Sequence, residues 1–170
     1  MDTSSTCALT VGAIACVTDI RSKRIPNVLT FGAAAVALIF HSIAHGGPGF
    51  GSAASGWLVG ALVMFVPFAL GGLGGGDVKL LAALGAWVGP VNAVWLALYA
   101  GIAGGVMSVV VALYCGCARR VLSNIWLLLQ HWQVAGLRRL KEISLEGGDG
   151  PRLAYALPIF AGLVLAIWLR

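Results

Sequence analysis

The sequence predicts an all-α membrane protein with about six transmembrane helices and one further amphipathic helix in the membrane interface. Two observations support this fold class. Of the 170 residues, 59% are apolar and only 10% are charged, whereas soluble domains carry about 25% charged residues. The apolar residues also fall into runs near the length of a membrane span, with short basic stretches between them. We therefore expect a single membrane-embedded domain over residues 1–170, with no room for a separate soluble domain.

Six apolar windows are expected to form the transmembrane helices. The first follows Asp2 without a preceding base, and bases come after it, which is typical of a transmembrane helix rather than a secretory signal. The fourth is short for a full crossing, so we expect it to be tilted or partly recessed. Pro151 stands at or near the start of the last helix. The windows are residues 4–20, 27–44, 53–70, 78–89, 91–115 and 152–169.

Residues 118–150 differ in amino-acid composition from the six windows. Apolar residues, among them Trp126 and Trp132, recur there at helical spacing between basic ends. This pattern favours a cytoplasmic amphipathic helix lying on the membrane surface. A helix that contacts substrate and one that binds a partner are the alternative interpretations.

The distribution of bases predicts the orientation. The segments after the first, third and fifth windows carry Lys or Arg, whereas the loops at 45–51 and 89–92 carry none. By the positive-inside rule, the basic segments face the cytoplasm and the N-terminus lies outside. The net charge of +5 then fits anionic lipid headgroups, because the bases form no continuous solvated face for nucleic acid.

No metal or other cofactor is expected from the cysteines and histidines. The four cysteines form no C-x-x-C pair, and they are interpreted as small buried hydrophobic residues rather than as zinc ligands or a disulfide framework. The three histidines are scattered and share no ligand spacing. The cysteines are Cys7, Cys16, Cys115 and Cys117.

Two of the six acidic residues, Asp19 and Asp77, stand at helix boundaries on the predicted cytoplasmic side. An acid in this setting carries a solvation cost and suggests function. Two carboxyl groups brought close together share a proton, and such a pair supplies a general acid and a general base. Each aspartate also has a simpler interpretation: Asp19 as a partner of Arg21 or Arg24, and Asp77 as a helix N-cap.

Glycines precede Asp77, and three of them, Gly74, Gly75 and Gly76, adjoin it directly. Without Cβ atoms, they allow close approach of another chain, so they could form an extended edge for a peptide substrate. A flexible turn or a close helix-packing motif explains them equally well.

Three more residues are candidates for support of the site. Pro26 is expected at the first position of the second helix. Asn27 is interpreted as its cap, with substrate contact as the alternative. Lys79 is expected to reach toward lipid headgroups, with a direct effect on an aspartate as the alternative.

Two segments of the sequence resemble the signature segments of the type IV prepilin peptidases, membrane aspartic peptidases of the GxGD class. They are Asp19-Ile-Arg-Ser-Lys-Arg-Ile-Pro-Asn and Gly74-Gly-Gly-Asp-Val-Lys-Leu, and the segment from Leu153 resembles the last helix of that family. The resemblance implies that Asp19 and Asp77 are the catalytic aspartates and that Gly74 and Gly76 are the motif glycines. It also implies cleavage of prepilin leaders at the cytoplasmic boundary of the bacterial inner membrane.

The chain resembles the short members that accompany Flp-type (Tad) pilus systems. The long members carry an extension with two C-x-x-C pairs and methylate the new N-terminus, so methylation is not expected here. Two other kinds of function remain as alternatives: a small proton-coupled transporter and a non-enzymatic scaffold for pilus assembly. A transporter would be expected to carry acids at the membrane midplane, and the sequence offers no indication of the oligomeric state.

Overall fold

A computed structural model describes residues 2–116, 119, 123, 126 and 154–169, and all regular structure in these residues is helical. The prediction of an all-α fold is therefore confirmed. The predicted amphipathic helix at 118–150 and the predicted helix start at Pro151 lie almost entirely outside the described residues. The helices are α1 (Thr3–Ser22), α2 (Asn27–Ala69), α3 (Gly75–Val88), α4 (Pro90–Tyr114) and α6 (Ala156–Trp168).

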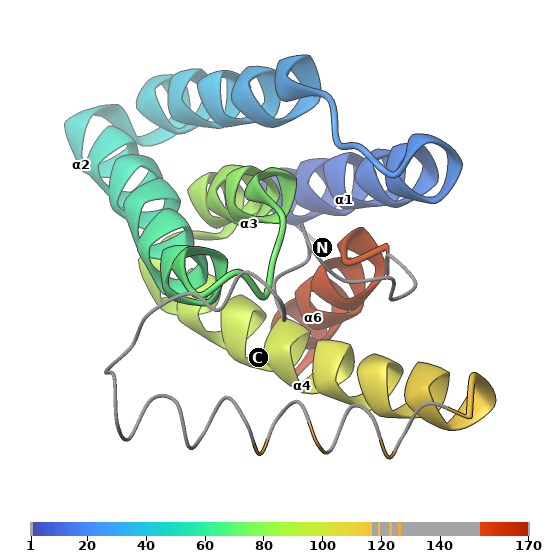
Figure 1. Cartoon of the computed structure of the whole chain (residues 1–170). Helices are drawn as coiled ribbons and strands as arrows, with labels where there is room; N and C mark the ends of the chain where they lie inside the picture. The colour runs from blue at the N-terminus through green and yellow to red at the C-terminus, as the bar shows by residue number, and fades with distance from the viewer. Residues whose placement is uncertain (1, 117–118, 120–122, 124–125, 127–153, 170) are drawn as a thin grey trace.

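Helix α3 lies at the centre of the bundle, with α1, α2, α4 and α6 around it (Figure 1). Every residue from 80 to 87 is buried. Close approach of α2 is possible because Gly56 of α2 lies against Gly85 of α3, and a Cβ on either glycine would overlap the backbone of the other. One turn along α2, a Cβ on Gly60 would meet the Leu81 carbonyl at 2.7 Å. These small residues place α3 against the second half of α2, as in membrane helix pairs.

Helix α6 packs against α4 and α1 through two further glycines. A Cβ on Gly162 would come within 2.6 Å of the Ala100 nitrogen in α4, and one on Gly12 of α1 would come within 2.8 Å of the Phe160 ring. The start of α6 is thereby held beside the C-terminal end of α1.

Among the described residues, three helices are long and apolar enough to cross a membrane: α1, α2 and α4. Their outer faces carry large apolar side chains, such as Val28, which is 86% exposed, and Ile43, which is 82% exposed. Helices α3 and α6 have 14 and 13 residues, and at 1.5 Å per residue they span only about 20 Å of a hydrocarbon core about 30 Å thick. The predicted fourth window, residues 78–89, corresponds to α3, and the shortness of α3 agrees with the expectation of a tilted or partly recessed helix.

The predicted loop at 45–51 is reduced to a sharp break at Gly46, so its position between two helical arms is confirmed and its length is wrong. Helix α2 runs through this region as 43 residues with one kink at Gly46, whose backbone is non-helical with φ of 62° and ψ of −146°. Figure 1 shows the bend between the two halves of α2. The positive φ favours glycine, and Pro48 adds a residue that suits the start of the second half. The second and third apolar windows are therefore two arms of one kinked helix.

Candidate active site

Asp19 lies near the end of α1, and its side chain is buried inside the bundle. It is 8% exposed, and its Oδ2 accepts a hydrogen bond of 3.1 Å from the backbone N–H of Ala156, the first residue of α6. The helix ends where the N–H of Lys23 donates to the Asp19 carbonyl oxygen at 2.8 Å. In the described part of the chain, the hydrogen-bonded partner of this carboxylate is thus a backbone amide, not the side chain of Arg21 or Arg24.

Asp77 lies in the first turn of α3 and is 9% exposed. The Gly74 N–H donates to its Oδ2 at 3.1 Å, and the Asp77 N–H donates to the Gly74 carbonyl oxygen at 3.1 Å. This reciprocal pair stabilises the start of the helix. The N-cap of α3 is Gly74, and Asp77 lies three residues later in the first turn. The alternative interpretation of Asp77 as the N-cap is therefore wrong.

The two segments that carry the aspartates lie side by side. A Cβ built on Gly76 would meet the Ile25 side chain at 3.5 Å, which is ordinary contact. The Lys79 ammonium donates to the Asn27 Oδ1 at 2.9 Å and lies 5.5 Å from the centre of the Phe31 ring. The start of α3 is thereby joined to the loop between α1 and α2.

The two carboxyl groups also interact electrostatically. Asp77 precedes the apolar part of α3 and lies outside the three candidate spans. Burial raises the pKa of its carboxyl group to about 6, the Gly74 N–H lowers it, and the nearby charge of Asp19 raises it. The Asp77 charge acts in turn on the hydroxyl of Tyr155, which immediately precedes Ala156. The start of α6 therefore lies within electrostatic reach of one aspartate and in direct contact with the other.

The glycines before Asp77 have separate structural roles. Gly71 ends α2 in a left-handed conformation with φ of 83°, and the Gly71 and Gly72 N–H groups donate to the Phe68 and Pro67 carbonyl oxygens at 2.9 Å, as in a Schellman motif. Gly75 and Gly76 belong to the first turn of α3. The interpretation of the glycines adjoining Asp77 as one extended edge is therefore wrong, since only Gly74 of those three has extended backbone angles.

Pro26 and Asn27 differ from their predicted helix positions. Helix α2 begins at Asn27, with Pro26 as its N-cap, and no side chain caps it. The prediction that Pro26 occupies the first helical position is wrong by one residue. The interpretation of Asn27 as a cap is also wrong, because its side chain accepts the hydrogen bond from Lys79 instead.

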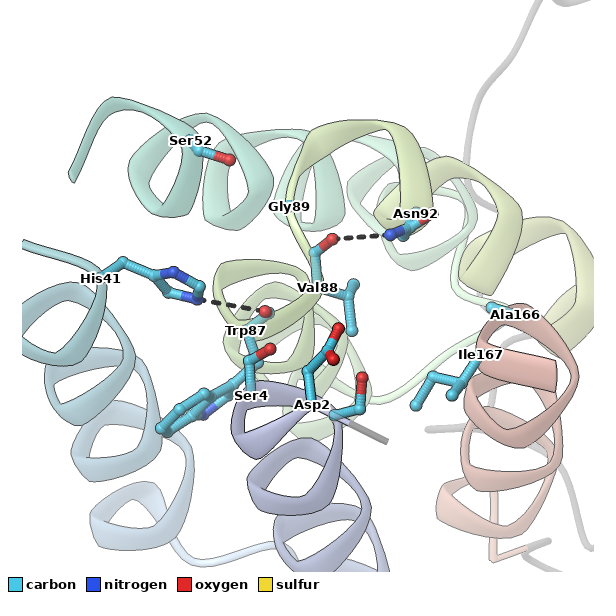
Figure 2. A pocket seen from close by; sticks show the side chains of 11 residues that line it. Asp2, Ser4, His41, Ser52, Trp87, Val88, Gly89, Asn92, Ala166 and Ile167 are labelled. Atoms are coloured by element: carbon cyan, nitrogen blue, oxygen red, sulfur yellow. Dashed lines mark hydrogen bonds between the residues drawn. The ribbon is translucent and has the colours of Figure 1, made fainter. Parts of the chain in front are cut away.

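A pocket of about 300 Å³ opens at the other end of the bundle and contains none of the predicted site residues. Figure 2 shows Ser4 of α1 and Asp2, which precedes α1, on the same pocket as His41, whose ring bonds the Trp87 carbonyl oxygen at 3.2 Å. The pocket is lined by the start of α1, the middle of α2, the end of α3, the start of α4 and the end of α6. The aspartates lie at the opposite end of each helix that carries them, so this pocket is separate from the candidate active site.

Cys16 and Ala156 belong to the site, although neither was expected there from the sequence. The Cys16 thiol is 6% exposed and donates to the Ala156 carbonyl oxygen at 3.2 Å. The prediction of small buried cysteines is confirmed for Cys16, but it is wrong for Cys115, which is exposed, and Cys7 is only half-buried. Cys117 lies outside the described residues, and the contact of Cys16 beside Asp19 was not predicted. The spacing of three residues between Cys16 and Asp19, which places both on one helical face, is the signal that could have indicated it.

The fold and the site together define a helical, membrane-embedded protein with two buried carboxyl groups, the chemical groups that an aspartic hydrolase uses. The model of the type IV leader peptidase family matches residues 7–109. The chain belongs to this family, and membership implies a peptidase that acts on prepilins in general. No curated protein and no solved structure shows a significant match to the chain.

Proposed function

We propose that the chain is a membrane aspartic endopeptidase that removes the basic leader from Flp-like type IV prepilins. Cleavage takes place at the cytoplasmic boundary of the bacterial inner membrane, and Asp19 and Asp77 are the catalytic residues. The observation that carries the proposal is that these two acids are buried on segments that lie side by side. Family membership supports the substrate class.

The roles of the two aspartates follow from their surroundings. The pKa of Asp77 is raised to about 6, so this carboxyl group is suited to hold a proton and to act as the general acid. Asp19 accepts an N–H at the positive end of α6, and such a donor stabilises a negative carboxylate. We therefore assign the role of general base to Asp19.

The proposed reaction needs only these two groups and a water molecule. Asp19 takes a proton from the water while the water oxygen attacks the peptide carbonyl carbon. Asp77 gives its proton to the carbonyl oxygen, which forms a neutral tetrahedral intermediate. The C–N bond then breaks as the Asp19 carboxyl delivers its proton to the leaving amine, and Asp77 recovers a proton from the intermediate hydroxyl.

Six residues around the aspartates are proposed to support the site rather than to react. They are Gly74, Gly75, Gly76, Lys79, Pro26 and Asn27. Gly74 bonds Asp77, and a Cβ at Gly74 would approach the Asp77 Oδ2 to 3.2 Å. Gly76 contacts Ile25, and the pair Lys79–Asn27 joins the two segments. A Cβ built on Gly75 would lie 3.6 Å from the Phe68 ring.

The proposed topology has six crossings with the N-terminus outside and both aspartates facing the cytoplasm. The two arms of α2 count as two crossings. The apolar part of α3 from Val78 onward and α6 count as short or recessed ones, so Asp77 lies at the boundary, outside the crossing. The basic segments after α1 and in 118–150 support this orientation through the positive-inside rule and through contact with anionic headgroups. Residues 1–170 are proposed to form one domain.

Cleavage by the purified protein in detergent tests the proposed function. A peptide with a prepilin leader and the first part of its apolar helix should be cut once, at the boundary between the two. A transporter or a scaffold predicts no cleavage, so an intact peptide after prolonged incubation with folded protein would contradict the proposal.

A further inference from the structure

The first residue of α6 is held by α1 through the two peptide groups that flank its Cα. The N–H of Ala156 donates to the Asp19 Oδ2 at 3.1 Å, and the carbonyl oxygen of Ala156 accepts from the Cys16 thiol at 3.2 Å. Cys16 and Asp19 are three residues apart, so they project from one face of α1. One residue of α6 is therefore bound through its donor and its acceptor by neighbouring side chains of one helix.

These contacts are shielded from solvent. Cys16 is 6% exposed, Asp19 is 8% exposed, and Ala156 is fully buried. Because Ala156 is the first residue of α6, its N–H has no acceptor within the helix. Asp19 supplies that acceptor, and in return the N–H fixes the direction of one carboxylate oxygen.

Docking of α6 does not depend on these two hydrogen bonds alone. Gly162 and Gly12 allow α6 to approach α4 and α1 closely, and buried Ile159 and Leu163 fill the contact. The hydrogen bonds of Ala156 therefore have a local effect, which is to set the position of the Asp19 carboxylate relative to the bundle.

We propose that Cys16 is a positioning residue of the peptidase. Its thiol binds the Ala156 carbonyl oxygen and so holds this residue in place, and the Ala156 N–H, which belongs to the preceding peptide group, orients Asp19 so that its second carboxylate oxygen can reach the reacting water. This inference rests on the proposed function. Small errors in the placement of a catalytic group lower the rate of the chemical step more than they lower substrate binding.

Substitution of Cys16 tests this inference in the full-length protein, with the same prepilin peptide as substrate. We expect Cys16→Ala to lower kcat about threefold to tenfold, the range for one lost hydrogen bond that acts on the catalytic group through Ala156, with KM within about twofold of wild type. Cys16→Ser keeps a donor and should recover most of the rate. Cys7→Ala, on the same helix and away from the aspartates, is the matched control and should behave as wild type.

A second change removes the N–H itself. Replacement of Ala156 by lactic acid through nonsense suppression converts its amide to an ester and leaves the side chain unaltered. It should lower kcat at least as much as Cys16→Ala, with little change in KM, because Asp19 then loses the hydrogen bond that orients its Oδ2.

Several outcomes would overturn the inference. These are a wild-type kcat in Cys16→Ala, no recovery in Cys16→Ser, or equal losses in Cys16→Ala and Cys7→Ala that follow the amount of folded protein. Failure of the wild-type chain to cleave would instead overturn the proposed function, and this inference with it.

Discussion

The Lys79 ammonium donates a hydrogen bond of 2.9 Å to the Asn27 side chain, and this contact joins the two segments that carry the aspartates. Lys79 follows Asp77 in the first turns of α3, and Asn27 begins α2. The ammonium also lies 5.5 Å from the centre of the Phe31 ring. Lys79 and Asn27 therefore join the two segments to each other. The sequence had instead suggested that Lys79 reaches toward lipid headgroups and that Asn27 caps a helix.

The Lys79–Asn27 contact predicts coupled effects of substitution. Lys79→Met and Asn27→Ala should each lower the cleavage rate about two- to fivefold, since each removes the same partly exposed hydrogen bond. The double variant should be no slower than the worse single variant, because there is only one contact to lose. A double-mutant cycle of cleavage rates measures this coupling, and strictly multiplicative effects would contradict it.

The electrostatic coupling of the aspartates predicts a change in the pKa of Asp77. This pKa is raised to about 6, partly by the charge of Asp19. In Asp19→Asn that charge is absent, so the pKa of Asp77 should fall. Titration of ¹³C-labelled aspartate carboxyl groups in micelles measures the shift, and Asp2→Asn serves as the control. An unchanged pKa of Asp77 would show that the two groups do not interact.

The raised pKa also predicts how stability depends on pH. The pKa of Asp77 rises from 3.8 to about 6 in the folded protein, so the folded state binds the proton more tightly. The ionised carboxyl group therefore costs stability, and this cost grows as the pH rises from 3.8 to about 6. Asp77→Asn should then stabilise the fold at pH above this range by on the order of 2 kcal/mol, and much less near its lower end.

Thermal unfolding followed by tryptophan fluorescence measures this difference. Asn keeps an oxygen that can accept the Gly74 N–H, so the helix start is retained. A variant that is equally or less stable than wild type at high pH would contradict the account of Asp77.

Much of the fold could be predicted from the sequence because lipid imposes simple requirements. Apolar run length located the helices, and Gly89 with Pro90 marked the break between α3 and α4, where Gly89 has φ of 81°. The break within 45–51 was also predicted, but its length was overestimated because glycine and proline mark helix kinks as well as loops. Whether backbone hydrogen bonds continue through Gly46 depends on how the two arms of α2 pack. The local sequence does not determine that packing.

Parts of the site could not be predicted for a similar reason. Asp19 and Asp77 stand out because acids are rare in apolar sequence. Ala156 does not stand out, since it acts through its backbone and every residue except proline has the same N–H. Its role depends on the packing of α6 beside α1, which brings together residues far apart in the chain.

The contact between Tyr155 and α4 predicts an effect of a small substitution. A Cβ on Gly104 would overlap the Tyr155 hydroxyl group. Gly104→Ala should thus displace the Tyr155 ring at the start of α6 and lower the cleavage rate severalfold, although alanine favours the helix by about 1 kcal/mol. Gly101→Ala and Gly105→Ala are matched controls, because nothing lies within 4 Å of either position. Equal rates in all three variants would contradict a role for this contact.

The central claim is that Asp19 and Asp77 act together as the catalytic pair. The most direct measurement is leader removal from a co-expressed Flp-type prepilin by Asp19→Asn, Asp77→Asn and the two Asp→Glu variants, with membrane accumulation of each variant measured alongside. We predict that both Asn variants accumulate normally and remove no leader, and that the Glu variants are severely impaired because one extra methylene displaces the reacting group. Near-normal leader removal by either Asn variant would contradict the claim.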